Sequence, residues 1–247
     1  MDISDSVLIT GVGGAVGAYL AGRFATAGRD VVGVSRRPQP ETPDFRQLTV
    51  DLARPDEVEA AVEKTQGSPS AIIHAAVDGA RDEHDFDSIE RSFRVNAIAP
   101  YVFTRALLLR AAADDAECRA VFIGSEAMFH ADDASGPYAA SKAASRVLTA
   151  SLAAKCRGGR QSVAYLSLGP LLTPARTAEL SALARRLDKS VPEIEALALA
   201  RSNPDLVIDR FIALDAVGDA IEMLLRLGRS GNGTVVRVDG GSAGSLI

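Results

Sequence analysis

Short runs rich in β-branched apolar residues alternate with longer Ala/Leu-rich stretches along most of this chain. The longer stretches have a helical period, so the alternation indicates repeated β-α-β units around a parallel sheet. The predicted strands are Val7–Thr10, Val31–Ser35, Gln47–Val50, Ala71–His74, Arg119–Ile123, Ser162–Ser167 and Thr234–Val238. The predicted helices are Ala15–Ala27, Pro55–Lys64, Ile89–Ala113, Tyr138–Arg157 and Asp215–Leu227. The sequence therefore predicts an α/β fold, a doubly wound and mostly parallel seven-stranded sheet with helices on both faces.

The segment 171–208 is the one long departure from this alternation. Within it, the run from Ser190 to Glu193 (SVPE) is typical of a helix capping box with proline in the first turn. The chain shows no internal repeat and no linker, and its 247 residues suffice for one substantial core. We therefore predict a single domain over residues 1–247, with a small helical insertion at 171–208 that forms a lid over the substrate.

Composition and charge narrow the range of partners. The formal net charge is -5, so there is no general attraction to nucleic acid or to an anionic membrane. The N-terminus lacks a basic and apolar leader, and no apolar run of about 18 residues occurs, which argues against export and membrane spanning. The two cysteines, Cys118 and Cys156, lie far apart in predicted regular structure and give no sign of a disulfide framework. A cytoplasmic protein with small-molecule partners is expected.

A glycine-rich loop, TGVGGAVG at residues 10–17, joins the first predicted strand to the first predicted helix. At this position in a Rossmann-type fold, the pyrophosphate of a dinucleotide meets unpaired N–H groups and the helix dipole. Gly11 would permit the tight turn, Gly14 would let the backbone approach a phosphate, and Gly17 would let the helix pack close to the sheet. The expected nucleotide-binding residues of the loop are Thr10, Gly11, Gly14, Ala15, Val16 and Gly17. The alternative is a tightly packed turn that binds no ligand.

The second predicted strand ends in Ser35, Arg36 and Arg37. A nucleotide with a free ribose 2′-hydroxyl is usually met here by Asp or Glu, whereas two cations suit a 2′-phosphate. The strand end therefore favours NADP(H) over NAD as the cofactor. The alternative is a strand end that only faces solvent, and Arg37 is the weaker candidate of the two arginines.

A further set of motifs follows in a fixed order. Asp51 follows the third strand, HAA occupies 74–76, Asn96 lies in the third predicted helix, and Ser125 precedes YAASK at 138–142 and VDGG at 238–241. Together with the glycine loop, this order and spacing resemble the short-chain dehydrogenase/reductase family over essentially the whole chain. The glycine spacing and HAA resemble its extended members, whereas the length and VDGG resemble its shorter ones, so the subgroup stays open.

The resemblance implies a catalytic set of Asn96, Ser125, Tyr138 and Lys142. Tyr138 would act as the acid, because hydride transfer leaves negative charge on a carbonyl oxygen that must be protonated. A free tyrosine has a pKa of about 10, so the Lys142 ammonium is expected to stabilise the phenolate. Ser125 would orient the substrate oxygen, and Asn96 would bend its helix and hold a water that relays protons to Lys142.

The resemblance also assigns the rest of the cofactor contacts. Gly169 and Thr173 keep the family's PGxIxT spacing, although Leu168 stands where proline is usual. The further cofactor-binding residues expected are Asp51, Leu52, Ala75, Ala76, Tyr138, Lys142, Gly169, Leu171 and Thr173. His74 is expected to support the strand and the cofactor. No metal site is expected, because His84 and His130 lack a carboxylate or cysteine at ligand spacing.

The function implied is hydride transfer between NADP(H) and a small carbonyl or alcohol substrate, by a homodimer or homotetramer built on 89–113 and 138–157. One alternative is an epimerase or dehydratase with tightly bound NAD, which the glycine loop favours and the lack of a large C-terminal substrate domain opposes. The other is a nucleotide sensor without turnover, which has no need of Ser125, Tyr138 and Lys142. The substrate cavity is expected to be apolar with a polar corner. Its predicted wall contains Glu126, Met128, Phe129, His130, Leu171 and Leu172. For Glu126 and His130 the alternative is a loop that only faces solvent.

Overall fold

The computed structural model describes residues 1–39, 45–79, 85–129 and 135–242. Its main sheet has seven parallel strands in the order β3-β2-β1-β4-β5-β6-β9. These strands are β1 (Val7–Thr10), β2 (Val31–Ser35), β3 (Arg46–Thr49), β4 (Ala71–His74), β5 (Arg119–Ser125), β6 (Ser162–Leu168) and β9 (Val235–Val238). The predicted α/β fold is confirmed, and the predicted strands differ from the observed ones only at their ends.

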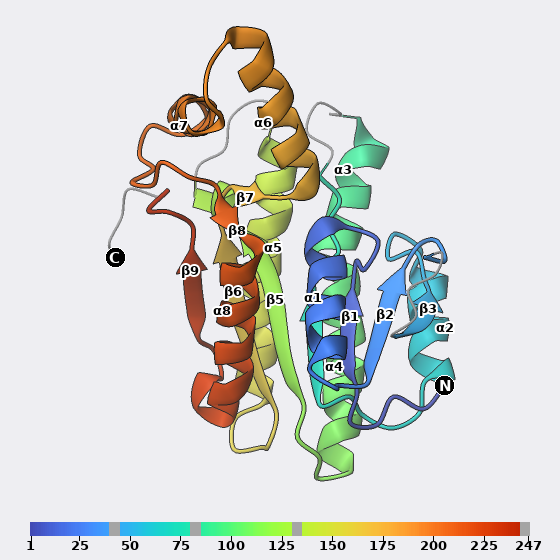
Figure 1. The fold of residues 1–247 in the computed structure, drawn as a ribbon. Helices are drawn as coiled ribbons and strands as arrows, with labels where there is room; N and C mark the ends of the chain where they lie inside the picture. Colours follow the sequence, from blue (N-terminus) through green and yellow to red (C-terminus); the bar gives the residue numbers. More distant parts are fainter. Residues whose placement is uncertain (40–44, 80–84, 130–134, 243–247) are drawn as a thin grey trace.

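Helices cover both faces of this sheet (Figure 1). The α-helices of the described residues are α1 (Ala15–Thr26), α2 (Pro55–Lys64), α3 (Phe86–Phe93), α4 (Ala99–Ala113), α5 (Gly136–Lys155), α6 (Pro174–Leu187), α7 (Val191–Ser202) and α8 (Leu214–Leu227). In Figure 1, α1 and α8 lie in front of the sheet, while α6 and α7 lie beyond the carboxyl ends of the strands. The chain therefore places its extra helices at the end of a parallel sheet where ligands usually bind.

Successive side chains of a strand point to opposite faces, and this alternation divides the core in two. Val7 and Ile9 of β1 pack with Leu20 of α1, whereas Leu8 packs on the other face with Phe103 of α4. Because both faces of the sheet are covered, the inner strands β1 and β4 are buried along their whole length rather than at alternate residues.

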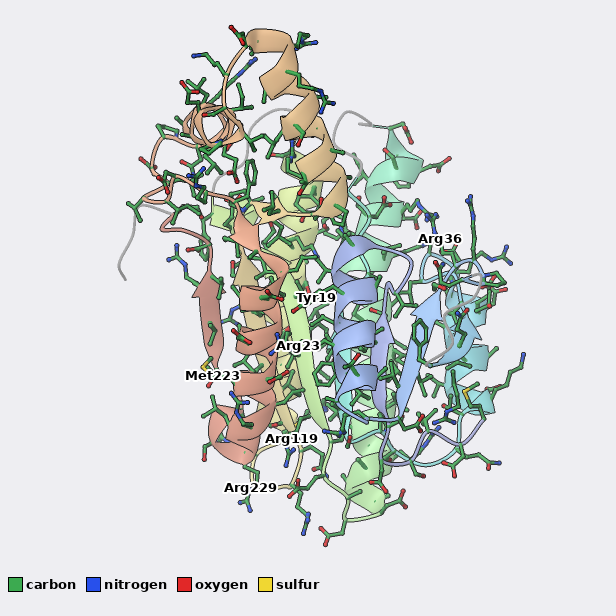
Figure 2. The ribbon with its side chains drawn as sticks, viewed as in Figure 1. Tyr19, Arg23, Arg36, Arg119, Met223 and Arg229 are labelled. Atoms are coloured by element: carbon green, nitrogen blue, oxygen red, sulfur yellow. The ribbon has the colours of Figure 1, made fainter. Side chains whose placement is uncertain are left out.

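A polar cluster joins α1 to α8 in front of the sheet (Figure 2). The guanidinium of Arg23 lies 2.7 Å from a carboxylate oxygen of Asp219 and 2.7 Å from one of Glu222. The hydroxyl of Tyr19 donates to Asp215 at 2.5 Å. These contacts fix the C-terminal helix against the helix that follows the glycine loop.

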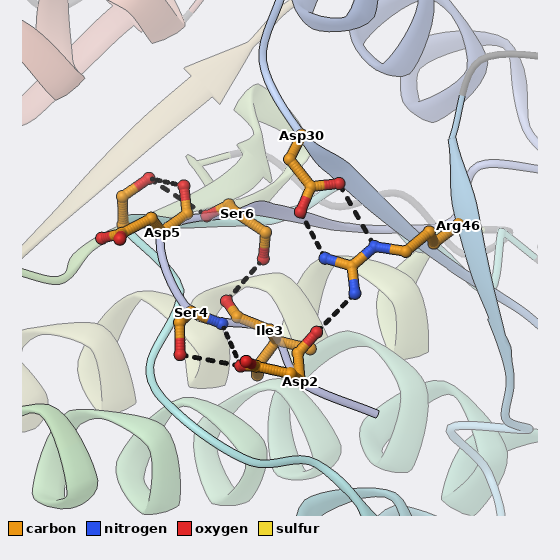
Figure 3. Close-up of polar contacts among 8 residues, drawn as sticks. Asp2, Ile3, Ser4, Asp5, Ser6, Asp30 and Arg46 are labelled. Carbon is orange, nitrogen blue, oxygen red and sulfur yellow. Dashed lines mark hydrogen bonds and ion pairs between the residues drawn. The ribbon is translucent and has the colours of Figure 1, made fainter.

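The N-terminal segment is held to the edge of the sheet by Arg46 of β3 (Figure 3). Its guanidinium pairs with the carboxylate of Asp30 and donates to the backbone oxygen of Asp2. The Asp2 carboxylate in turn accepts from the Ser4 backbone N–H at 2.9 Å. A charged side chain on an edge strand thus binds the first residues of the chain. Such a charge also disfavours pairing of the exposed edge with a strand of another molecule.

The expectation of one helix over Ile89–Ala113 is wrong. A π-helical turn at Arg94–Ile98 separates α3 from α4, and Asn96 lies at its centre. The cause is Pro100, which has no N–H to donate to the Asn96 carbonyl, while the Ala99 N–H bonds to the oxygen of Arg94. The sequence pattern of apolar residues continues through this turn, so periodicity alone did not reveal the interruption.

Segment 171–208 is helical, as expected, and contains α6 and α7. The predicted capping box is present, since Ser190 N–H donates to Glu193 Oε2 at 2.8 Å and Glu193 N–H donates to Ser190 Oγ. A two-stranded sheet of β7 (Leu171–Leu172) and β8 (Ile212–Ala213) was not predicted, because two residues are too few to show a period. Its side chains face two ways, with Leu171 and Ile212 against the core of the sheet and Leu172 against α6 and α7.

Two glycines of α1 provide a matched test of the packing between helix and loop. A Cβ on Gly17 would lie 2.2 Å from the backbone oxygen of Gly11, whereas a Cβ on Gly22 meets nothing within 4 Å. We expect Gly17→Ala to lower the free energy of unfolding by about 1–3 kcal/mol, the usual cost of overpacking. We expect Gly22→Ala to raise it by roughly 0.5–1 kcal/mol through helix propensity. Urea unfolding of both variants measures the two changes, and equal effects would contradict the close contact.

Candidate active site and nucleotide cleft

The glycine loop brings three chain segments together at the carboxyl end of β1. Gly11 has a φ of 78°, and a Cβ there would lie 2.5 Å from the Cα of Ala76 after β4. Gly14 is the N-cap of α1, and no described side chain caps this helix by a hydrogen bond. The first N–H groups of α1 thus face an open position, which is the arrangement that binds anions.

A cavity of about 540 Å³ extends from this loop along the ends of β2, β3 and β4. It brings together nine of the residues predicted to contact a cofactor, namely Gly11, Gly14, Ser35, Arg36, Arg37, Asp51, Leu52, Ala75 and Ala76. Predicted residues outside its lining are Thr10, Ala15, Val16, Gly17, Tyr138, Lys142, Gly169, Leu171 and Thr173. The structure therefore gathers half of the predicted cofactor contacts around one cavity.

Half of the cavity wall consists of residues that the motifs did not predict. These further lining residues are Gly13, Val34, Pro38, Gln39, Val50, Val77, Asp78, Arg91 and Val95. Arg91 and Val95 are four residues apart on the helix that leads to Asn96, a spacing that puts two side chains on one face. That spacing was the signal that could have identified them.

Arg36 and Arg37 lie at the end of β2 on the rim of this cavity, and Figure 2 shows Arg36 at that end of the strand. Both side chains are exposed, and neither guanidinium has an ion-pair partner among the described residues. The Ser35 hydroxyl is already engaged, because it donates to the backbone oxygen of Arg37 at 2.7 Å. Ser35 thus shapes the turn, and the two guanidinium groups are available to a ligand.

Lys142 is buried beside Tyr138, with 4% of its surface exposed. Its Nζ lies 5.9 Å from the centre of the Tyr138 ring and donates to the backbone oxygen of Ile123 at 3.1 Å. Burial lowers the pKa of Lys142 to about 8. Ser125 ends the strand that carries Ile123, and its Oγ accepts from the Ala127 N–H at 3.2 Å. The structure therefore gathers three members of the predicted catalytic set at the junction of β5 and α5.

Asn96 joins the cavity wall to α5. Its Nδ2 donates to Ser141 Oγ at 2.9 Å and to the Asp78 backbone oxygen at 2.9 Å, while its Oδ1 accepts from the Asp78 N–H at 2.9 Å. Both amide protons are therefore engaged by the protein. Ser141, which no motif singled out, lies next to Lys142 and donates to the Tyr138 backbone oxygen at 2.7 Å.

Tyr165, a buried residue of β6, forms a hydrogen bond with the backbone of Lys142. The Tyr165 hydroxyl donates to the backbone oxygen of Lys142 at 3.0 Å. Gly124 makes room for it, since a Cβ there would lie 2.1 Å from the Tyr165 hydroxyl oxygen. The residue before Ser125 must therefore be small, and this requirement belongs to packing rather than to chemistry.

His74 lies fully within the core at the end of β4. Its Nε2 is 2.5 Å from Thr104 Oγ1, its Nδ1 is 3.5 Å from Thr10 Oγ1, and its ring is 4.7 Å from that of Phe122. Burial, with a smaller contribution from the Lys142 charge, lowers its pKa to about 3. Thr10 Oγ1 also accepts from the Ala76 N–H at 3.2 Å, so the Thr10 hydroxyl lies between His74 and the backbone of the cavity wall.

Two residues expected near the nicotinamide have structural partners. The Thr173 hydroxyl is the N-cap of α6 and accepts from the Arg176 N–H at 3.2 Å, which leaves its own proton to donate. A Cβ on Gly169 would lie 2.7 Å from the Asp239 backbone oxygen. The absence of a side chain at 169 is therefore explained by the close approach of the segment after β9.

The expected substrate wall begins as a 3-10 helix, Glu126–Phe129. The guanidinium of Arg237 lies 5.0 Å from the centre of the Phe129 ring, and Met128 packs against the core. His84 and His130 lie outside the described residues. No group of three metal-ligating side chains occurs in the described ranges, and none of their helices is long and apolar enough to cross a bilayer.

A doubly wound parallel sheet with a glycine loop at the point where the strand order reverses is the arrangement of a Rossmann-type fold. A sequence profile of the NAD dependent epimerase/dehydratase family matches residues 7–168. The chain belongs to this family, and the resemblance inferred from its motifs is confirmed.

Solved structures with the same fold extend the comparison over the whole chain. A short-chain dehydrogenase family protein from Francisella tularensis subsp. tularensis SCHU S4 is 17% identical, with a TM-score of 0.77, and the match covers 98% of this chain and 100% of that one. The 4-hydroxyisoleucine dehydrogenase complexed with NADH is 19% identical, with a TM-score of 0.81 and coverages of 97% and 99%. L-sorbose reductase from Gluconobacter frateurii, complexed with NADPH and L-sorbose, is 19% identical, with a TM-score of 0.80 and coverages of 99% and 99%. A search of curated protein sequences gave no significant match.

The buried His74 predicts a pH dependence of stability. Its pKa is about 3 in the folded chain against an ordinary value of 6.5, which the unfolded chain retains, so the unfolded chain binds more protons between these values. Stability therefore rises with pH across this window and is lost as pH falls below 6.5. We expect His74→Asn to reduce the difference in unfolding free energy between pH 7 and pH 4 by about 3 kcal/mol. Urea unfolding at several pH values measures this, and parallel curves for the two proteins would contradict it.

Proposed function

We propose that this protein is an NADP(H)-dependent oxidoreductase that transfers a hydride between the nicotinamide and a small carbonyl or alcohol substrate, with Tyr138 as the acid or base. The observation that carries the proposal is the buried Lys142 ammonium beside the Tyr138 ring at the end of β5. A buried amine held by one carbonyl oxygen is costly for stability and is characteristic of functional sites.

Several features of the cleft support binding of a phosphorylated dinucleotide. Gly11 and Gly14 leave the backbone open at the start of α1, where the pyrophosphate would lie. Asp51, Leu52 and Ala76 would surround the adenine, and the guanidinium of Arg36 would pair with the 2′-phosphate. Bound there, the nicotinamide would supply or accept the hydride.

The chain's own residues would handle the proton and the geometry. The Tyr138 hydroxyl would donate its proton to the carbonyl oxygen of the substrate, or take one from an alcohol, and Ser125 Oγ would hold that oxygen in place. The Lys142 ammonium would stabilise the Tyr138 phenolate. Asn96 would keep the start of α5 in register through Ser141. Leu171 and Thr173 would face the nicotinamide from the start of the lid, with the Thr173 proton free to donate.

An epimerase or dehydratase that keeps NAD bound through its cycle is the second candidate. It is favoured by the description of the matching family and by the glycine spacing of the loop. The two candidates differ in whether the purified protein releases bound NAD when it is denatured. Stoichiometric NAD released from the purified protein would favour the epimerase, whereas steady NADPH consumption with ketones favours the reductase. Binding of nucleotide without turnover on any substrate class would favour a sensor.

Replacing the proposed acid tests the catalytic assignment. We expect Tyr138→Phe to lower kcat by roughly a hundredfold or more, the usual scale for loss of a positioned acid, and to leave NADPH binding nearly unchanged. Tyr101→Phe is the control, since Tyr101 packs against the core from α4. Stopped-flow or steady-state absorbance at saturating NADPH measures kcat, and activity of Tyr138→Phe within a few fold of wild type would refute the assignment.

The preference for NADPH over NADH tests whether Arg36 and Arg37, at the end of β2, bind the 2′-phosphate. A guanidinium gains about 1.5–3 kcal/mol from each charge-assisted hydrogen bond to a phosphate, so NADPH should bind roughly ten- to hundredfold more tightly than NADH. We expect Arg36→Asp to weaken NADPH binding strongly and NADH binding little, and Arg37→Asp to have the smaller effect. Titration of both nucleotides into all three proteins measures this. Equal affinities of the wild type for NADH and NADPH would show that Arg36 and Arg37 do not bind the 2′-phosphate.

A further inference from the structure

An ion bridge crosses one wall of the nucleotide cleft. Arg91 of α3 lies between two carboxylates, with its Nε 3.2 Å from Asp78 Oδ2 and its Nη1 3.8 Å from Asp51 Oδ2. All three residues line the cavity. Their side chains are only partly exposed, at 35% for Arg91, 27% for Asp51 and 17% for Asp78, so the bridge is partly shielded from solvent.

Each carboxylate belongs to a segment that is fixed elsewhere. Asp51 Oδ1 accepts from the Ala53 N–H at 3.0 Å, which shapes the turn after β3. The Asp78 backbone is bound in both directions by the side chain of Asn96, which also reaches Ser141 of the catalytic helix. Arg91 therefore joins the end of β3 to the loop after β4, and both segments line the cavity.

The carboxylates of this wall would repel a negatively charged ligand. A nicotinamide dinucleotide carries several negative charges, and Asp51 and Asp78 present two more to the same cavity. At separations of a few ångströms in a partly buried site, like charges repel by amounts that change affinity severalfold. The guanidinium of Arg91 lies within ion-pair distance of both carboxylates and compensates part of their charge.

We propose that Arg91 is a positioning residue of the nucleotide cleft, which neutralises Asp51 and Asp78 and holds their two segments at the separation that the adenosine half of the cofactor requires. The inference rests on the proposed function in one respect, that the ligand is a nicotinamide dinucleotide. Arg91 belongs neither to the proposed catalytic residues nor to the end of β2 that is proposed to bind the 2′-phosphate. An ordinary exposed ion pair would contribute little to either stability or binding.

Fragments of the cofactor separate this role from a general structural one. Adenosine 2′,5′-bisphosphate probes the adenosine half, and nicotinamide mononucleotide probes the other half. Isothermal titration, or competition against NADPH fluorescence, gives their affinities without any turnover. We expect Arg91→Gln to weaken adenosine 2′,5′-bisphosphate and NADPH by about tenfold, because two carboxylates then remain without their cation. Nicotinamide mononucleotide should bind as in the wild type.

A second substitution tests the charge compensation directly. In the double variant with Arg91→Gln and Asp78→Asn, one uncompensated carboxylate is removed, and we expect about threefold of the lost affinity to return. Arg105→Gln is the control for loss of a cation, since Arg105 is an exposed arginine of α4 that does not line the cavity. It should leave the affinity for both fragments unchanged.

The outcomes are distinct. Unchanged affinity of Arg91→Gln for the bisphosphate, no recovery in the double variant, or equal losses for both fragments would overturn the role of Arg91. If the wild type binds NADPH and the bisphosphate but transfers no hydride, the catalytic proposal fails and the role of Arg91 stands on the binding data. If the wild type binds no nicotinamide nucleotide, both proposals fail together.

Discussion

The reversal of strand order between β1 and β4 is the constraint on which the site depends. From β1 the chain builds the sheet outward through β2 and β3, then returns to add β4, β5 and β6 on the other side. The connections from β1 and β4 leave in opposite directions, so no helix covers the sheet edge between them. The glycine loop and the backbone of Ala76 meet in that opening, and Gly11 can only be glycine because the two segments nearly touch.

Three buried polar side chains behind this opening form hydrogen bonds with the rest of the protein. Lys142 has a backbone carbonyl of β5, His74 has two threonine hydroxyls, and Asn96 has three protein partners. An unsatisfied polar group in such a place would cost a large part of the stability of a domain. Their hydrogen bonds therefore do two things, since they maintain the fold and also fix where the functional groups of α5 stand relative to the sheet.

The order and type of the main strands could be predicted because each is a run of apolar residues bounded by turn residues, as with Ala71–His74. The glycine loop and the YAASK motif could be placed for the same reason, since each lies at a strand end or a helix start. The π-turn at Asn96 could not, because it depends on one missing N–H at Pro100 within an unbroken apolar pattern. Arg91 was missed because the pairing of a charged side chain with Asp51 and Asp78 is a contact between elements far apart in sequence.

The two-stranded sheet of β7 and β8 divides the apolar interior. Leu171 and Ile212 belong to the core beneath the sheet, while Leu172 packs with Leu180 and Ile194 in a small separate cluster of α6 and α7. Substitutions within that cluster need no repacking of either face of the main sheet. The helices α6 and α7 thus have an apolar cluster of their own, so a change of side-chain size there can be absorbed without disturbing the packing on the main sheet.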